Sequence, residues 1–262
     1  MNRPDGFAPA ELLLHQRVLL AGGLAAIVAA SWAYLWAMAG DMAASTRHAL
    51  HTGAGLAGSH DAGISAILVM WLVMVGAMML PTAAPMTFIH ARFQRGREHS
   101  RSPAPYSALF ALGYLAAWSV FAIVATALQV GLEHLALLDG MGMSLTSAPL
   151  AGGVLIGAGL FQWSRFKDAC LTQCRTPVGF FMGFWREGHG GALAMGLHHG
   201  LYCVGCCWAL MAVMFVVGTM NMLWIALLTA AMLFEKLGPA GDRVGQLIGV
   251  ALVAAGGWLL LS

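Results

Sequence analysis

Apolar residues of this chain gather in seven long runs, which short polar segments separate. A transmembrane helix needs about 20 predominantly apolar residues to cross the hydrocarbon core of a bilayer. The runs cover residues 18–39, 63–91, 106–130, 150–164, 191–217, 222–234 and 244–261. They predict an all-α fold, a polytopic transmembrane helix bundle of about seven spans. We expect one integral membrane domain over residues 1–262.

The first run ends in Ala37-Met38-Ala39, which resembles a signal-peptidase site. The apolar region of a signal peptide has about 7–15 residues and follows a basic leader. This run is longer, and the segment before it carries acidic residues, so we expect an uncleaved anchor. In the second run, Pro81 and Pro85 remove backbone donors and should break the helical ladder near its end.

Basic residues set the expected orientation, since cytoplasmic loops of membrane proteins are enriched in lysine and arginine. With the N-terminus in the cytoplasm and seven spans, twelve of the thirteen Lys and Arg residues face the cytoplasm, and only Arg47 lies outside. The predicted location is the inner membrane of a bacterium. The outer loops then hold His48, His51, His60 and His134.

Composition agrees with a membrane protein and excludes several other classes. The chain is 60% hydrophobic and 9% charged, with a mean hydropathy of +0.77, whereas soluble domains are about 25% charged. The net charge is only +2 and no basic run suggests nucleic acid. The five cysteines are odd in number and do not indicate a disulfide framework. No phosphate-binding loop, nucleophile elbow or His-Glu-x-x-His motif is present, so we name no catalytic residue.

The fifth run carries the strongest chemical signal. At about 100° per residue, one face of a helix holds His199, Cys203, Cys206, Cys207 and Met214, with Met195 at one edge and Met211 at the other. Imidazole, thiol and thioether groups are soft ligands that select Cu(I), and less exclusively zinc or iron–sulfur clusters. Polar groups inside membrane spans are costly and usually functional. The alternative is that the thiols act as small buried hydrophobic groups.

Two further sets of candidate ligands lie elsewhere in the chain. Met78, Met79 and Met86 flank the two prolines, although methionines at helical spacing often only fill a core. Cys170 and Cys174 share a helix face. They could form a two-coordinate Cu(I) site or a redox pair, or they could be thiols without a role. Their basic neighbours Arg165, Lys167 and Arg175 should lower the thiol pKa values. Glu235 and Lys236 are expected to form an ion pair at the membrane interface.

Several short motifs together resemble a bacterial family known as predicted metal-binding integral membrane proteins, a domain of unknown function sometimes labelled copper chaperone. They include Met70-Trp71, Ala77-Met78-Met79-Leu80-Pro81, Pro85-Met86, Gln162-Trp163, Lys167, Ala169-Cys170-Leu171, Cys174, Pro177, Gly205-Cys206-Cys207-Trp208, Met211, Gly218, Met220-Asn221 and Glu235-Lys236. The resemblance covers residues 32–236. It implies a membrane bundle with a metal ligand set, but no substrate and no direction of transport.

The resulting hypothesis is a copper-handling membrane protein with Cu(I) held by Cys, His and Met within the bundle. It would serve in copper delivery, transport or as a chaperone, with lipid around it and a copper protein or membrane enzyme as receiver. A second hypothesis is a redox enzyme subunit with copper or haem, in which His198 and His199 would be the candidate ligands. A third is a metal-free structural subunit of a membrane complex.

Overall fold

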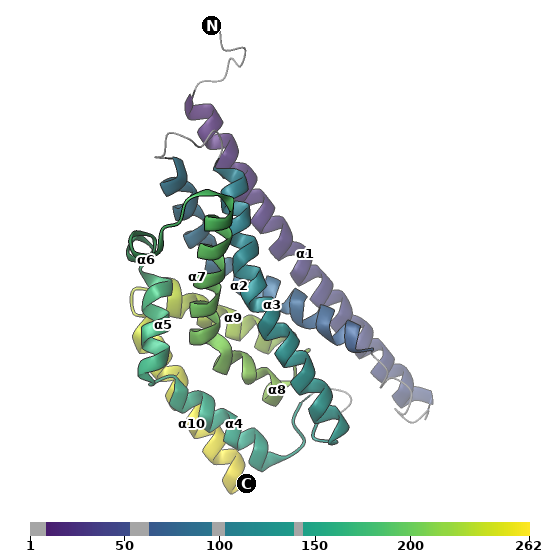
Figure 1. Ribbon diagram of the computed structural model, residues 1–262. Helices are drawn as coiled ribbons and strands as arrows, with labels where there is room; N and C mark the ends of the chain where they lie inside the picture. Colours follow the sequence, from purple (N-terminus) through teal and green to yellow (C-terminus); the bar gives the residue numbers. More distant parts are fainter. Residues whose placement is uncertain (1–8, 53–62, 96–102, 139–143) are drawn as a thin grey trace, which may run out of the picture.

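The computed structural model describes residues 9–52, 63–95, 103–138 and 144–262. These residues form helices, and within them the only strand-like pairing is an isolated bridge between Leu138 and Leu145. The expected all-α bundle is therefore confirmed (Figure 1). The helices are α1 Pro9–Thr52, α2 Ile64–Arg95, α3 Ala104–His134, α4 Ala148–Phe161, α5 Arg165–Arg175, α6 Pro177–Phe184, α7 Gly188–Ala212, α8 Met214–Val217, α9 Met222–Leu237 and α10 Gly241–Leu261.

Five segments in the described part of the chain are long and apolar enough to cross a membrane, by length and composition. They are Val18–Met42, Ile64–Gln94, Ala104–His134, Gly188–Val217 and Gly241–Leu261, as in a multi-pass membrane protein. Two of the seven expected spans correspond to α4 and α9, which have only 14 and 16 residues. The count of seven remains a prediction.

Helices α1 and α3 extend beyond the ends of the apolar runs, into the polar segments that follow them. The prediction that His48, His51 and His134 lie in outer loops is wrong for their backbone, because α1 continues to Thr52 and α3 continues to His134. Charged and polar residues can continue a helix beyond the apolar core of a bilayer, so the end of an apolar run is a poor guide to the end of a helix.

The prolines of α2 interrupt its hydrogen-bond ladder without ending the helix, which continues to Arg95. Pro81 has no N–H to give to the carbonyl of Ala77 four residues earlier. The indole Nε1 of Trp32 in α1 donates to that carbonyl at 3.2 Å. A neighbouring helix thus satisfies the group that proline leaves free, as helices in lipid require.

Helices α3 and α7 make the closest contact of the bundle, at glycines. A Cβ on Gly196 would lie 1.9 Å from the carbonyl oxygen of Phe110, and one on Gly113 would lie 2.1 Å from that of Leu193. A side chain at either position would therefore separate the helices. Small residues allow such approach in membrane bundles. The contact aligns the inner face of α7 with α3.

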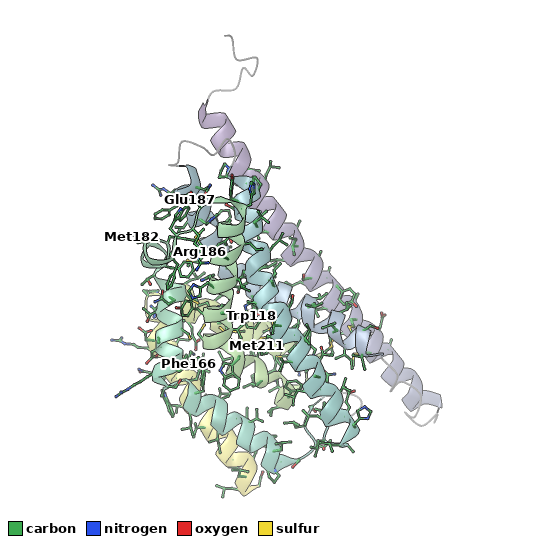
Figure 2. All side chains as sticks on the ribbon, viewed as in Figure 1. Trp118, Phe166, Met182, Arg186, Glu187 and Met211 are labelled. Carbon is green, nitrogen blue, oxygen red and sulfur yellow. The ribbon has the colours of Figure 1, made fainter. Side chains whose placement is uncertain are left out.

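A core rich in methionine and cysteine lies between α2, α3, α5, α7 and α9. It contains the buried methionines Met70, Met74, Met78, Met79, Met211, Met214, Met220 and Met232, together with four of the five cysteines. Figure 2 shows Trp118 and Met211 near its middle. Figure 1 shows α4 and α10 side by side, and Ile248 and Leu252 of α10 pack against this core. The start of α1 and the end of α10 lie at opposite ends of the molecule.

Candidate metal centre

Helices α5 and α7 bring four thiols together. The Sγ atom of Cys174 lies 4.0 Å from that of Cys206, and Cys206 Sγ lies 3.4 Å from Cys207 Sγ. Cys206 also donates to the carbonyl of Cys203 at 3.2 Å. All five cysteines are free thiols. We call Cys174, Cys203, Cys206 and Cys207 the thiol cluster.

The spacing within the thiol cluster suits a thiolate-bound ion. Metal–sulfur bonds of about 2.3 Å put two sulfurs about 4.0 Å apart in a trigonal arrangement and about 4.6 Å apart in a linear one. Among the described residues, no set of three or more His, Cys, Asp and Glu side chains is arranged to hold a metal ion. The two sulfurs of the thiol cluster whose separation matches these values are those of Cys174 on α5 and Cys206 on α7.

Cys203 is surrounded by hydrogen-bond donors. The ammonium Nζ of Lys236 lies 2.8 Å from Cys203 Sγ, the hydroxyl of Tyr114 lies 2.9 Å away, and Trp118 Nε1 donates at 3.3 Å. The cysteine is 1% exposed and the lysine 5%. A buried ammonium needs an anionic partner, so the geometry favours a thiolate at Cys203.

A second layer holds these donors in place. Lys236 also donates to Thr82 Oγ1 at 3.1 Å, and Thr82 in turn donates to the carbonyl of Met79 at 2.8 Å. The hydroxyl of Tyr114 also lies 3.1 Å from the same carbonyl, so its single proton is shared between this oxygen and Cys203 Sγ. Helices α2, α3, α7 and α9 therefore all contribute to the surroundings of a single sulfur.

The expected interfacial pair of Glu235 and Lys236 is wrong. Glu235 is 2.8 Å from the ammonium of Lys167, and both side chains are buried. Adjacent residues of a helix point about 100° apart, so the two reach different partners. Lys167 also donates to Gln162, which ties α5 to the end of α4. This ion pair joins α5, with its two cysteines, to α9.

Cys170 and Cys174 lie on one helix, α5, as expected, but only Cys174 belongs to the thiol cluster. Cys170 packs against α7 where Gly205 leaves room, since a Cβ there would lie 2.7 Å from its Sγ. The prediction of lowered thiol pKa values is wrong. Burial raises the pKa of Cys170, and a hydrogen bond to Cys203, together with burial, raises that of Cys174. Their basic neighbours are engaged elsewhere, Lys167 with Glu235 and Arg175 with Asp242.

The remaining predicted ligands divide between two places. Met78, Met79, Met211 and Met214 are buried in the same apolar core as the thiol cluster. Met86 lies in a separate cluster with Phe110, Phe180, Phe181 and Met195. His199 stacks on Phe110 and Tyr114, and its Nδ1 has no hydrogen-bond partner. His198 packs on Phe184 and Tyr202.

Of the histidines expected in outer loops, His134 has an exposed side chain, whereas His60 and the side chains of His48 and His51 lie outside what the structure describes. Sequence reasoning missed Lys236, Tyr114 and Trp118 as neighbours of the thiols. A signal existed for the lysine, because a cation at the end of an apolar run needs a partner.

A family model described as PpoB2, copper chaperone, matches residues 68–259. The chain belongs to this family. No curated protein and no solved structure matches the chain. The PpoB2 match extends from α2 to α10, so it includes the thiol cluster, Lys236 and the buried methionines, and it begins after α1. The copper named in the family description agrees with a core of soft sulfur ligands.

Proposed function

We propose that the protein binds Cu(I) as cargo in the thiol cluster and passes it to a copper protein or membrane enzyme. The contact of Cys174 on α5 with Cys206 on α7, at 4.0 Å between sulfurs, carries this proposal. Cu(I) is stable with two or three soft ligands, so it does not need the larger ligand sets of other metals. Cys207 beside Cys206 offers a third sulfur.

The charge of Lys236 supports a monovalent ion. When Cys203 is one of two thiolates that bind the ion, these thiolates and one Cu(I) carry a net charge of −1, which a buried ammonium neutralises. Lys236 lies 2.8 Å from Cys203 and so places its charge next to the cluster. A neutral ensemble is the least costly to keep away from water. The same lysine pairs with Cys203 when no ion is bound.

Buried methionines supply a route to the cluster. Met214 at the start of α8 and Met211 near the end of α7 come before Cys207 and Cys203, and Met220 in the following turn and Met222 at the start of α9 add two more. Most steps are three or four residues, which places side chains about 5–6 Å apart. Thioethers bind Cu(I) weakly enough to exchange it, whereas thiolates hold it. Met78 and Met79 of α2 line the same core.

In this proposal the protein lies in the inner membrane of a bacterium with its N-terminus in the cytoplasm. The methionine turn at residues 218–222 then faces outward and α5 faces the cytoplasm. The ion would move between the outer face and the thiol cluster, and a partner would exchange it at either side.

Metal titration of the purified protein tests the proposal. We expect tight binding of Cu(I) under reducing conditions and its loss in Cys174→Ser and in Cys206→Ser. Cys170→Ser is the matched control, because Cys170 is a buried thiol of the same helix that packs on Gly205. Unchanged stoichiometry in folded Cys174→Ser and Cys206→Ser proteins would reject the site. An intense visible haem band would instead favour a redox subunit.

A further inference from the structure

An open groove lies on the outer side of α10, next to the turn that joins α4 to α5. Its volume is about 630 Å³, and its lining residues are Trp163, Arg243, Gln246, Leu247 and Val250. Trp163 belongs to the turn, and the other four lie on the first turns of α10. No acidic residue is among the described residues that line it. We call it the α10 groove.

A glycine of α10 gives the α10 groove its aromatic wall. A Cβ on Gly249 would lie 3.0 Å from Cε2 of Trp163 and 3.0 Å from Cβ of Gln162. The indole ring therefore lies directly against the backbone of α10. Trp163 is 43% exposed, so part of the ring stays open to the surroundings. The ring forms a flat side of the groove and is not part of the core.

Arg243 brings an uncompensated positive charge to the α10 groove. The residue before it, Asp242, pairs with Arg175 of α5. Adjacent residues of a helix point about 100° apart, so Asp242 and Arg243 face different surroundings. No residue in the described part of the chain forms an ion pair with Arg243. Its guanidinium is therefore available to an anion from outside the chain.

The lining of the α10 groove changes from polar to apolar along the helix. Arg243 is the last charged residue before the apolar run 244–261, and Gln246 follows one turn later. Leu247 and Val250, which are 68% and 56% exposed, continue the groove into that run. In a membrane this order puts the polar groups at the level of the headgroups and the aliphatic groups at the level of the acyl chains. Tryptophan is enriched at the same boundary.

We propose that the α10 groove binds an anionic phospholipid, with its phosphate on Arg243 and Gln246 and an acyl chain along Leu247 and Val250. Arginine suits a phosphate because its planar fork donates two parallel hydrogen bonds. Basic pockets beside membrane-spanning helices bind lipid headgroups in this way. In the orientation proposed above, the lipid belongs to the cytoplasmic leaflet. The inference does not depend on the chemistry of the thiol cluster.

The other side of α10 covers a buried ion pair. A Cβ on Gly245 would lie 3.1 Å from Oε1 of Glu235 and 3.7 Å from Nζ of Lys167, so the backbone of α10 passes close to both groups. A ligand that binds only the folded chain stabilises it. A phospholipid in the α10 groove thus stabilises the packing of α10 over the pair that joins α5 to α9.

Native mass spectrometry of the full chain in detergent tests the inference, with phosphatidylglycerol and phosphatidylcholine of the same acyl chains as the two added lipids. We expect one equivalent of phosphatidylglycerol to bind at least tenfold more tightly than phosphatidylcholine. Arg243→Gln should abolish this difference and leave the binding of phosphatidylcholine unchanged. Arg243→Lys keeps the charge but not the paired donors, so it should lose less of the affinity.

Thermal unfolding provides a second measurement. Phosphatidylglycerol should raise the melting temperature of the wild type more than that of Arg243→Gln, because binding to the folded state alone raises stability. The melting temperatures without lipid verify that the variant is folded, as expected for an exposed arginine. A rise of the same size in both proteins would contradict binding at Arg243.

Arg186→Gln is the matched control, because Arg186 is another exposed arginine and does not line the α10 groove. An equal loss of phosphatidylglycerol in Arg186→Gln would show a diffuse effect of charge and would overturn the inference. Equal binding of the two lipids to the wild type would also overturn it. Complete displacement of phosphatidylglycerol by inorganic phosphate would show a phosphate site without a lipid. None of these outcomes affects the thiol cluster, whose binding of Cu(I) is measured separately.

Discussion

Cys203 and Lys236 show how one buried contact can set the charge of a metal site. Their atoms lie 2.8 Å apart, and Tyr114 and Trp118 complete the surroundings of the sulfur. A buried lysine is stable only with an anion nearby. The pair therefore keeps one thiolate available inside a membrane protein, where thiols would otherwise stay protonated.

Replacing Lys236 tests this role. Lys236→Met removes the charge but keeps most of the apolar stem, so Cys203 should become protonated and Cu(I) should bind about tenfold more weakly or worse at neutral pH. Lys236→Arg keeps the charge and should lose less of the affinity for Cu(I). The measurement is a competition titration on both variants, with thermal unfolding to verify the fold. Equal affinities of the two variants would contradict the charge role.

The raised pKa of Cys174 predicts a pH dependence of copper binding. At neutral pH this thiol carries its proton, which must leave when the sulfur binds Cu(I). The apparent affinity should therefore rise with pH, about tenfold per pH unit for each proton released. Titrations between pH 6 and 8 measure the slope. Cys174→Ser should reduce this slope by the equivalent of about one released proton, and Cys170→Ser should leave the slope unchanged.

At the scale of elements, glycine contacts determine which helix faces meet. Helices α3 and α7 approach at Gly113 and Gly196, and α5 approaches α7 at Gly205. These contacts bring Cys174 of α5 next to Cys206 of α7, and Trp118 and Tyr114 of α3 next to Cys203. Larger residues at these positions would separate the helices and would therefore move the cysteines of α5 and α7 away from each other.

Gly196→Ala should destabilise the bundle strongly. Its Cβ would lie 1.9 Å from the carbonyl oxygen of Phe110, which is backbone and cannot rotate away. Overpacking typically costs about 1–3 kcal/mol, and a backbone clash should reach the upper end or exceed it. Thermal unfolding in detergent measures the loss. Gly190→Ala, on the same helix with no atom within 4 Å of its added Cβ, should be neutral or slightly stabilising.

Methionines of α7 and α8 permit a kinetic test of the proposed route. Met211→Leu with Met214→Leu keeps the buried volume, so stability should change by less than about 1.5 kcal/mol. Loading of the thiol cluster by external Cu(I) should slow, while its affinity at equilibrium stays similar. Stopped-flow transfer from a Cu(I) chelate gives the rate, with exposed Met182→Leu as the control. A normal rate would show that both methionines only fill the core.

For the whole molecule, the number of helices that cross the membrane determines on which side each end of the bundle lies. The start of α1 and the end of α10 lie at opposite ends of the molecule (Figure 1), as an odd number of crossings requires. Five helical segments in the described residues suffice for crossing, and α4 and α9 are shorter than about 20 residues. Short helices can cross where the bilayer thins or flanking residues reach the interface.

Reporter fusions should place the N-terminus and α5 in the cytoplasm and the C-terminus outside. The reason is the positive-inside rule, with twelve of thirteen Lys and Arg residues on one side when seven spans cross. A fluorescent protein that folds only in the cytoplasm should be dark at the C-terminus and bright when inserted after Thr176. A bright C-terminus would reverse the orientation, and a dark insertion after Thr176 would remove α4 as a span.

The apolar runs alone determined that the chain is a helical membrane bundle, because the length and hydropathy of a span are local properties. Helical periodicity likewise placed Cys203, Cys206 and Cys207 on one buried face, and Cys170 and Cys174 on one helix. Only the tertiary structure decided that Cys174 joins the thiol cluster, that Lys236 reaches Cys203 and that Met86 packs with Phe110 and Met195 in another cluster. Periodicity states which residues of one helix share a face, but not which face of another helix meets it. That choice depends on close contacts such as Gly196 against Phe110, which arise only when distant segments pack.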